Sequence, residues 1–185
     1  MILLYNPPSS SGRKPILPCS LLALGALLEG KHAYEIVDGN LLGAPASAGD
    51  TTELVDRRLV QTGATALAVT VMPGPQLQDA VPLCQELKRR HPQLTIIWGG
   101  YFPSQHWRTA LRASYVDYVV RGHGEVAFLG LLDALAAGEQ RPQLQGVCFR
   151  GPDGEPVDGG MPAIPKPADL PDIEAPHGAV RGHGG

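Results

Sequence analysis

The residues of this chain that are best placed to contact a ligand follow three apolar, strand-like segments, each of which stops at glycine or proline. The run 66–69 ends at Thr70, and the turn 71–76 reads Val-Met-Pro-Gly-Pro-Gln. A second run ends at the pair 99–100, Gly-Gly, and a third at 121–125, Arg-Gly-His-Gly-Glu. Glycine exposes its backbone, so a ligand can come close and accept hydrogen bonds from free N–H groups. The pattern predicts a slot for an extended ligand, although single glycines at such places also serve only to make tight turns.

Histidine and cysteine, which often ligate metals or act as nucleophiles, are dispersed along the chain. His91, His106 and His123 lie on different predicted loops, and the three cysteines are far apart, at positions 19, 84 and 148. No Cys-x-x-Cys pair and no three-cysteine cluster of the iron–sulfur kind is present. We therefore expect no metal site and no catalytic residue in this chain. Reduced thiols are expected, as in a cytoplasmic protein.

Charge and hydropathy exclude two classes of partner. The formal net charge of −3 over 185 residues gives no basic footprint for nucleic acid. The most apolar stretch, residues 16–28, is interrupted by Pro18, Ser20 and Gly25 and is too short to cross a bilayer. Because the chain begins directly with a strand-like segment at residues 2–5, we expect no signal peptide and a cytoplasmic location.

Apolar segments alternate with helical patterns along most of the chain. Five strands are expected at 2–5, 34–38, 66–70, 94–98 and 115–120, and five helices at 18–29, 51–62, 76–90, 103–113 and 125–137. Pro82 lies inside the third helix and predicts a kink. The alternation predicts an α/β fold with a doubly wound, flavodoxin-like, five-stranded parallel sheet. Right-handed crossovers and short connections favour the strand order 2-1-3-4-5.

Three regions of different composition predict the domain organisation. Residues 1–140 form the α/β domain, and residues 141–158 contain two short strands around Pro-Asp-Gly, which indicate an appended β-hairpin. Residues 159–185 are rich in proline and glycine and have the composition of a linker. We expect this linker to lead toward a further domain.

The predicted strand order places a ligand site where the sheet reverses, between the first and third strands. The loops 6–12 and 71–76 then form a crevice, and the loops 99–103 and 122–125 lie beside it. A phospho-accepting receiver domain is excluded, because Asn6, Thr70 and Arg121 stand where that class needs acidic residues and a lysine.

Two patterns that are typical of nucleotide-binding proteins occur in the same loops. The sequence Gly-x-Gly-x-x-Ala at 122–127 follows the fifth strand rather than the first, so we interpret it as accidental. The loop 9–12, Ser-Ser-Ser-Gly, is suited to the phosphate of FMN, and a flavodoxin-like FMN-binding domain stays an alternative.

A succession of motifs resembles the N-terminal cobalamin-binding domain of cobalamin-dependent radical S-adenosylmethionine enzymes. The resemblance covers roughly residues 1–175, in order and with family-like spacing. It rests on Asn-Pro-Pro at 6–8, Asp-Gly-Asn at 38–40, Thr-Val-Met-Pro-Gly-Pro-Gln at 70–76, Gly-Gly-Tyr-Phe-Pro at 99–103, Val-Asp-Tyr-Val-Val-Arg-Gly-His-Gly-Glu at 116–125 and Gly-Val-Cys-Phe at 146–149. The Pro-rich segment 164–176 resembles the linker that leads into the radical barrel of these enzymes.

The resemblance implies a set of cofactor-binding residues. It implies that Gly99, Gly100 and Gly122 make room for the nucleotide tail, and that Thr70 hydrogen-bonds its polar atoms. Glu125 would accept from a ribose or a rim amide, or else simply stabilise the start of its helix. The residues implied to lie beneath the corrin ring are Val71, Met72, Gly74, Pro75 and Gln76. The other implied contacts are Asn6, Pro7, Pro8, Ser9, Asp38, Asn40, Tyr101, Phe102, Pro103 and Gly124.

One absence bears on the cobalt chemistry that the resemblance implies. Methionine-synthase-like domains carry an Asp-x-His-x-x-Gly loop whose histidine ligates cobalt, and this chain has no such sequence. Bound cobalamin is therefore expected to be base-off, with no histidine ligand. Met72 is a conceivable thioether ligand, but apolar cover of the lower face is the simpler role.

The function implied by the resemblance is cobalamin binding within a radical S-adenosylmethionine enzyme, a methyltransferase, although relatives of this architecture also cyclise or oxygenate. S-adenosylmethionine and a 4Fe–4S cluster would belong to a radical domain in cis beyond Gly185, because the cluster motif is absent here. The chain would then not be catalytic alone. A stand-alone cobalamin carrier module is the alternative of another class.

Overall fold

Parallel strands form the centre of the structure, a computed structural model that describes residues 1–9, 17–42 and 48–162. One seven-stranded sheet has the order β2-β1-β3-β4-β5-β6-β7. Strands β1 to β5 are parallel, and β6 and β7 each run antiparallel to the preceding strand. The bounds are β1 Ile2–Asn6, β2 Tyr34–Asp38, β3 Ala66–Thr70, β4 Thr95–Gly99, β5 Tyr118–Val120, β6 Val147–Arg150 and β7 Pro156–Val157.

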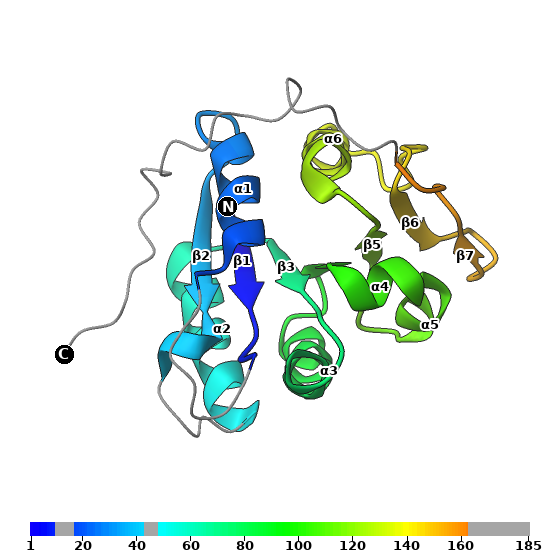
Figure 1. Ribbon diagram of the computed structural model, residues 1–185. Coiled ribbons are helices and arrows are strands. Elements are labelled where there is room, and N and C mark those ends of the chain that lie inside the picture. The colour runs from blue at the N-terminus through cyan, green and yellow to red at the C-terminus, as the bar shows by residue number, and fades with distance from the viewer. Residues whose placement is uncertain (10–16, 43–47, 163–185) are drawn as a thin grey trace.

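Helices cover both faces of this sheet (Figure 1). One face carries α1 (Cys19–Leu28) and α6 (Gly124–Ala136), and the other carries α2 (Ala48–Thr62), α3 (Pro75–Arg90) and α5 (Trp107–Arg112). The short α4 (Tyr101–Gln105) connects β4 to α5, and a 3-10 helix, η1 (Gly39–Leu42), follows β2. Because both faces are covered, the strands are nearly continuous apolar runs. The predicted α/β class with a mostly parallel sheet is confirmed.

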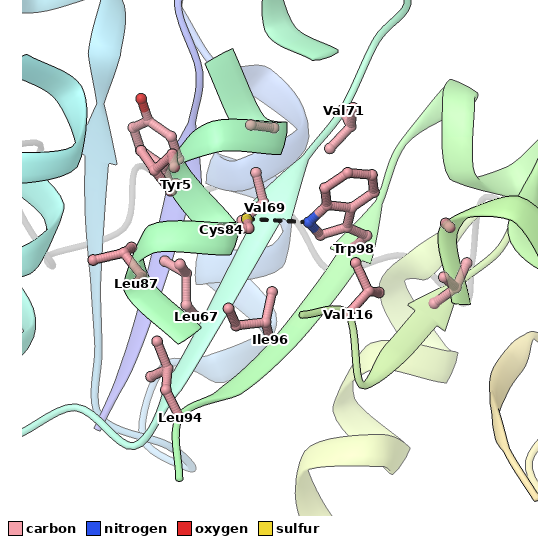
Figure 2. Packing of buried hydrophobic residues seen from close by; sticks show 14 of the residues in the cluster. Tyr5, Leu67, Val69, Val71, Cys84, Leu87, Leu94, Ile96, Trp98 and Val116 are labelled. Atoms are coloured by element: carbon pink, nitrogen blue, oxygen red, sulfur yellow. Dashed lines mark hydrogen bonds between the residues drawn. The ribbon is translucent and has the colours of Figure 1, made fainter. Parts of the chain in front are cut away.

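Successive residues of a strand point to opposite faces, which divides the core in two. In β1, Ile2 and Leu4 pack under α1 and α6, whereas Leu3 and Tyr5 pack on the opposite side. Figure 2 shows the second cluster, in which Trp98 of β4 packs beside α3. The Trp98 indole Nε1 donates to the Sγ of Cys84 at 3.3 Å. Burial raises the pKa of the Cys84 thiol to about 12, so this cysteine remains a protonated core residue.

A buried carboxyl group lies between β1, α2 and α3. Asp79 accepts hydrogen bonds from the Tyr5 hydroxyl at 2.7 Å and the Thr51 hydroxyl at 2.6 Å. Burial raises the pKa of Asp79 above its ordinary value of 3.8, although both hydrogen bonds favour the ionised form. Burial and the adjacent Asp79 also raise the pKa of Tyr5. This group therefore ties three elements together on the side of the sheet opposite α1 and α6.

The sheet has seven strands rather than five, because the predicted hairpin continues it; the parallel strands β1 to β5 lie in the order β2-β1-β3-β4-β5. Residues Val147–Arg150 pair with β5 and carry the sheet on to β7. Strand β5 offers a free edge of backbone donors and acceptors there, and the hairpin satisfies them. Residues on both sides of the position between 140 and 141 therefore contribute strands to the same sheet.

Several predicted helix and strand bounds also differ. The helix expected over 103–113 is divided into α4 and α5 at His106, whose ψ of 34° leaves the helical region. Strand β5 is shorter than expected and begins at Tyr118, and α2 begins at Ala48 rather than at residue 51. Pro82 does not divide α3, because it is exposed and water can satisfy the carbonyl that loses its partner.

The predicted linker lies mostly outside the described residues, since the structure describes it only as far as residue 162. Within the part that is described, no helix combines the length and apolar character needed to span a bilayer.

Candidate ligand-binding site

A cavity of about 240 Å³ lies between α1, α6 and the sheet, and is called here the α1–α6 cavity. Its origin is the small size of Ala68 on β3 and of Gly99 at the end of β4. Strand β3 turns Ala66 and Ala68 toward α1 and α6, while Leu67 fills the opposite face. Strand β4 ends at Gly99, which has no side chain to fill the space above it. The two helices therefore cannot close on the sheet at this end.

Each wall of the cavity comes from a different element. Helix α1 contributes Leu21 and Leu24, α6 contributes Phe128, and the sheet contributes Ala68 and Ile97. The mouth lies at the carboxyl-end edge of the strands and is lined by Ser20, Thr70, Gly99, Gly100, Gly122, His123, Gly124 and Glu125. The interior is thus apolar, and the mouth is polar and rich in exposed backbone. This is the edge at which open α/β sheets hold their ligands.

The loops at the mouth are fixed to one another by backbone hydrogen bonds. The Val71 N–H donates to the Gly99 carbonyl at 2.8 Å, and the Phe102 N–H donates to the Val71 carbonyl at 3.1 Å. Gly100 sits in this junction with φ of +96°, and a Cβ there would lie 3.0 Å from the Val71 nitrogen. Glycine is therefore required at position 100 by backbone conformation and by space.

Ser104 joins the loops after β4 and β5. Its hydroxyl donates to the Gly100 carbonyl at 2.7 Å and accepts from the Gly122 N–H at 3.0 Å. Only 6% of Ser104 is exposed, so both hydrogen bonds are shielded from water. Ser104 was not among the predicted site residues, because a single serine in a helical segment carries no sequence signal.

A second polar cluster links the loops after β1, β2 and β3. The Gln76 side-chain amide donates to Asn6 Oδ1 at 3.0 Å and to the Pro7 carbonyl at 3.1 Å, and its Oε1 accepts from the Met72 N–H at 3.0 Å. Asn6 in turn donates to Asp38 Oδ1 at 2.9 Å. Gln76 is only 6% exposed. It therefore holds the loop 71–75 against the end of β1, rather than presenting its amide to a ligand.

Asn40 extends this cluster to the loop after β1. Its side-chain amide donates to Asp38 Oδ1 at 2.8 Å, and its Oδ1 accepts from the N–H and the hydroxyl of Ser9 at 2.8 and 3.0 Å. Ser9 is the one residue of the predicted phosphate loop 9–12 that the structure describes. Both donors of Ser9 are already used by Asn40, which weakens the FMN hypothesis.

The structure separates the predicted site residues into three groups. Thr70, Gly99, Gly100, Gly122, Gly124 and Glu125 line the α1–α6 cavity. Asn6, Pro7, Ser9, Asp38, Asn40 and Gln76 form the polar cluster described above, and Pro8 packs near Gly39. The remaining residues belong to the loops after β3 and β4: Val71 and Pro103 are buried, Phe102 is half-buried, and Met72, Gly74, Pro75 and Tyr101 are exposed. The Val71 side chain packs into the core on the α3 side, so only its backbone reaches this edge.

Sequence reasoning missed the inner walls of the cavity. Leu21, Leu24, Ala68, Ile97 and Phe128 looked like ordinary core residues. The one available signal was the breadth of the apolar surface on α1, whose leucines wrap more than one face. His123 was also set aside as a scattered histidine, yet it stands at the cavity mouth at the start of α6.

Glu125 places an unpaired hydrogen-bond acceptor at the cavity mouth. Its Oε2 is buried, and among the described residues it is the buried side-chain oxygen or nitrogen that lacks a hydrogen-bond partner. Buried polar atoms are nearly always paired in folded proteins. A ligand hydroxyl or amide that donates to this oxygen would satisfy it. The apolar interior and this unpaired acceptor together fit a ligand with an apolar end and a polar middle.

Comparison with known proteins assigns the fold to a family. The family model described as "B12 binding domain" matches residues 14–132, which include α1, the strands β2 to β5 and most of α6. The chain belongs to the B12 binding domain family. The match covers every element that lines the α1–α6 cavity.

Three similar proteins extend this result. The anaerobic magnesium-protoporphyrin IX monomethyl ester cyclase of Synechocystis is 28% identical in an alignment of 162 residues that covers 80% of this chain and 30% of that protein. The radical S-adenosylmethionine methyltransferase TsrM of Kitasatospora setae, solved with cobalamin and a 4Fe–4S cluster, is 20% identical with a TM-score of 0.69. That match covers 86% of this chain and 30% of TsrM. The cobalamin-dependent S-adenosylmethionine radical enzyme OxsB, solved with aqua-cobalamin, is 16% identical with a TM-score of 0.73, over 92% of this chain and 23% of OxsB.

The comparisons establish the fold of the chain and the fraction of each relative's length that it spans. The domain fold is that of cobalamin-dependent radical S-adenosylmethionine enzymes. The chain spans about a third or less of the length of each relative.

Proposed function

We propose that this B12 binding domain holds cobalamin with the nucleotide tail in the α1–α6 cavity and the corrin ring over the carboxyl ends of β1 and β3. The observation that carries the proposal is the cavity itself, apolar inside and polar at its mouth. Its volume of about 240 Å³ is below the ~300–1,000 Å³ of pockets that enclose a whole drug-sized ligand. It is therefore suited to one part of a large cofactor, while the corrin ring lies outside on the sheet edge.

The residues at the mouth supply the polar contacts of the tail. The Thr70 hydroxyl and the free Oε2 of Glu125 are positioned at the mouth for ribose, phosphate or amide groups. The backbone of Gly99 and Gly124 leaves the approach open. The exposed loop 72–75 would lie beneath the corrin ring, held in place by Gln76.

A tail seated in the cavity removes its base from cobalt, so we propose a base-off cofactor. No histidine occurs in residues 6–9 or 71–76, which border the ring position. Met72, which is 47% exposed, is the side chain of the loop after β3 that is best placed to cover the lower face. Bound cobalamin supplies a cobalt centre able to accept and transfer a methyl group, and a weakly coordinated lower face favours that chemistry.

We further propose that the domain acts together with a radical S-adenosylmethionine domain in cis, which would bind S-adenosylmethionine and a 4Fe–4S cluster, and that the complete enzyme is a methyltransferase. Support comes from TsrM, a radical S-adenosylmethionine methyltransferase that binds cobalamin and a 4Fe–4S cluster, from OxsB, a cobalamin-dependent S-adenosylmethionine radical enzyme, and from the fraction of their length that this chain represents. A stand-alone carrier module would have the same cavity. Continuation of the gene into a Cys-x-x-x-Cys-x-x-Cys motif would separate these two functions.

Reconstitution of the purified chain with hydroxocobalamin, followed by desalting, tests the binding proposal. We expect the corrin absorbance to remain with the protein at one equivalent. After reduction to Co(II), the electron paramagnetic resonance spectrum should lack nitrogen splitting from a lower ligand. Loss of all corrin absorbance on desalting would contradict the proposal, and retention of FMN instead would favour the flavodoxin-like alternative. Nitrogen splitting in the bound form would contradict the base-off state alone.

A further inference from the structure

The α1–α6 cavity has two chemically different layers. Thr70 and Gly99 end their strands at the mouth, and Ala68 and Ile97 lie two residues earlier on the same strands. At roughly 3.3 Å per residue this places them about 6.5 Å deeper. The helices lead the same way, because α1 and α6 begin at the mouth and reach Leu24 and Phe128 about one turn farther along.

The deep layer offers no hydrogen-bonding group. The side chains of Leu24, Ala68, Ile97 and Phe128 are entirely hydrocarbon. The backbone around Ala68 is paired on both sides, with β1 and with β4, and Ile97 is paired with β3 and β5. The polar side chains that line the cavity, Ser20, Thr70, His123 and Glu125, all belong to strand ends or first helical turns at the mouth. Whatever reaches the deep layer must be satisfied without hydrogen bonds.

We infer that the deep layer selects the base at the end of the corrinoid tail, taking a benzimidazole with a hydrocarbon edge and rejecting a purine. This inference rests on the proposed function. The methylated benzene edge of dimethylbenzimidazole has no donor or acceptor, so burying it beside Ala68 and Phe128 is favourable. An adenine base places an amino group and ring nitrogens at the same depth, where they exchange water for hydrocarbon. Leaving even one of these groups unpaired lowers affinity by about tenfold or more.

The test compares three corrinoids on the same protein: cobalamin, a corrinoid whose tail ends in adenine, and cobinamide, which lacks the nucleotide. We expect the adenine-tailed corrinoid to bind at least tenfold more weakly than cobalamin, and cobinamide to bind more weakly than cobalamin as well. Binding is measured by equilibrium titration of the corrin absorbance.

A matched pair of variants tests whether the deep layer is responsible for the preference for cobalamin over the adenine-tailed corrinoid. Ala68→Ser places a hydroxyl in the deep layer, and we expect it to reduce the preference for cobalamin over the adenine-tailed corrinoid by severalfold. Ala66→Ser adds the same hydroxyl on the same face of β3 but at the first residue of the strand, a position that does not line the cavity. We expect Ala66→Ser to leave the preference unchanged, with circular dichroism to confirm that both variants fold.

The outcomes distinguish this inference from the proposed function. Equal affinity for cobalamin and the adenine-tailed corrinoid would overturn the selection while leaving cobalamin binding intact. Equal affinity for cobalamin and cobinamide would show that the tail makes no use of the cavity, and would also overturn it. Failure to bind any of the three would overturn the proposed function itself.

Discussion

Gly99 provides the sharpest test of the α1–α6 cavity, because at this position stability and binding are expected to change in opposite directions. A Cβ built at Gly99 would meet only the Val120 carbonyl oxygen, at 3.9 Å, which is ordinary van der Waals contact. Gly99 also lacks the positive φ of Gly100 and Gly122. A valine therefore fits the backbone, and its branched side chain enters the cavity at the mouth.

The size of both effects follows from the structure. Replacing glycine by valine at a strand position raises the free energy of unfolding by about 0.5–1 kcal/mol, because the unfolded chain loses freedom and the side chain suits a strand. Excluding an aromatic base of ~150–200 Å² from an apolar site removes about 4–5 kcal/mol at ~25 cal/mol/Å². At about 1.4 kcal/mol per tenfold, complete exclusion weakens cobalamin binding by about a thousandfold, and partial exclusion by about a hundredfold.

The assay combines urea unfolding with titration of the corrin absorbance. Thr95→Val is the matched control, because it places a valine at the other end of β4, away from the cavity. We expect Thr95→Val to bind cobalamin as the wild type does. Undiminished cobalamin affinity in folded Gly99→Val would refute the assignment of the cavity to the tail. A Gly99→Val protein destabilised by several kcal/mol would refute the geometry of this strand end.

Two further predictions concern the polar groups around the site. Gln76→Met should lower the free energy of unfolding by about 2–4 kcal/mol, because it leaves the buried Asn6 Oδ1 and Pro7 carbonyl and the Met72 N–H without their partner, whereas Gln78→Met on the exposed face of α3 should have little effect in the same urea titration. Similar stabilities of the two variants would contradict the role given to Gln76. Burial raises the pKa of Asp79, so the folded state binds this proton more tightly than the unfolded state does. The contribution of Asp79 to stability is therefore fully present below the ordinary pKa of 3.8 and falls as the pH rises through the raised value. The stability of the wild type minus that of Asp79→Asn should decrease as the pH rises above about 4, and a difference independent of pH would count against this assignment.

The sequence determined the order of the elements and the edge of the sheet at which the α1–α6 cavity opens. Apolar runs of strand length that alternate with helical patterns define an α/β sheet through local periodicity alone. The carboxyl ends of parallel strands share one edge, so the glycines after β3, β4 and β5 were expected at one mouth, although Gly74, which follows β3, does not line it. Gly99, Gly100 and Gly122 do line the α1–α6 cavity together.

The tertiary structure decided which residues at that edge face the cavity. Thr70 and Val71 are neighbours in sequence, yet Thr70 lines the cavity while the Val71 side chain is buried in the core on the α3 side. Gln76, expected beneath the corrin ring, proved to be a buried connection between loops. Sequence patterns cannot settle such cases, because a residue at a strand end is free to turn to either face until the packing of neighbouring loops fixes its direction.

The deep layer shows most clearly that some features of the site arise only from tertiary packing. Leu24, Ala68, Ile97 and Phe128 come from four separate segments and meet only when α1 and α6 pack on the sheet. Each has the composition of an ordinary core residue, and nothing local indicates that the space between them stays open. That space exists because Ala68 on β3 and Gly99 at the end of β4 leave room beneath α1 and α6, and this combination is a property of the packed structure rather than of any one segment.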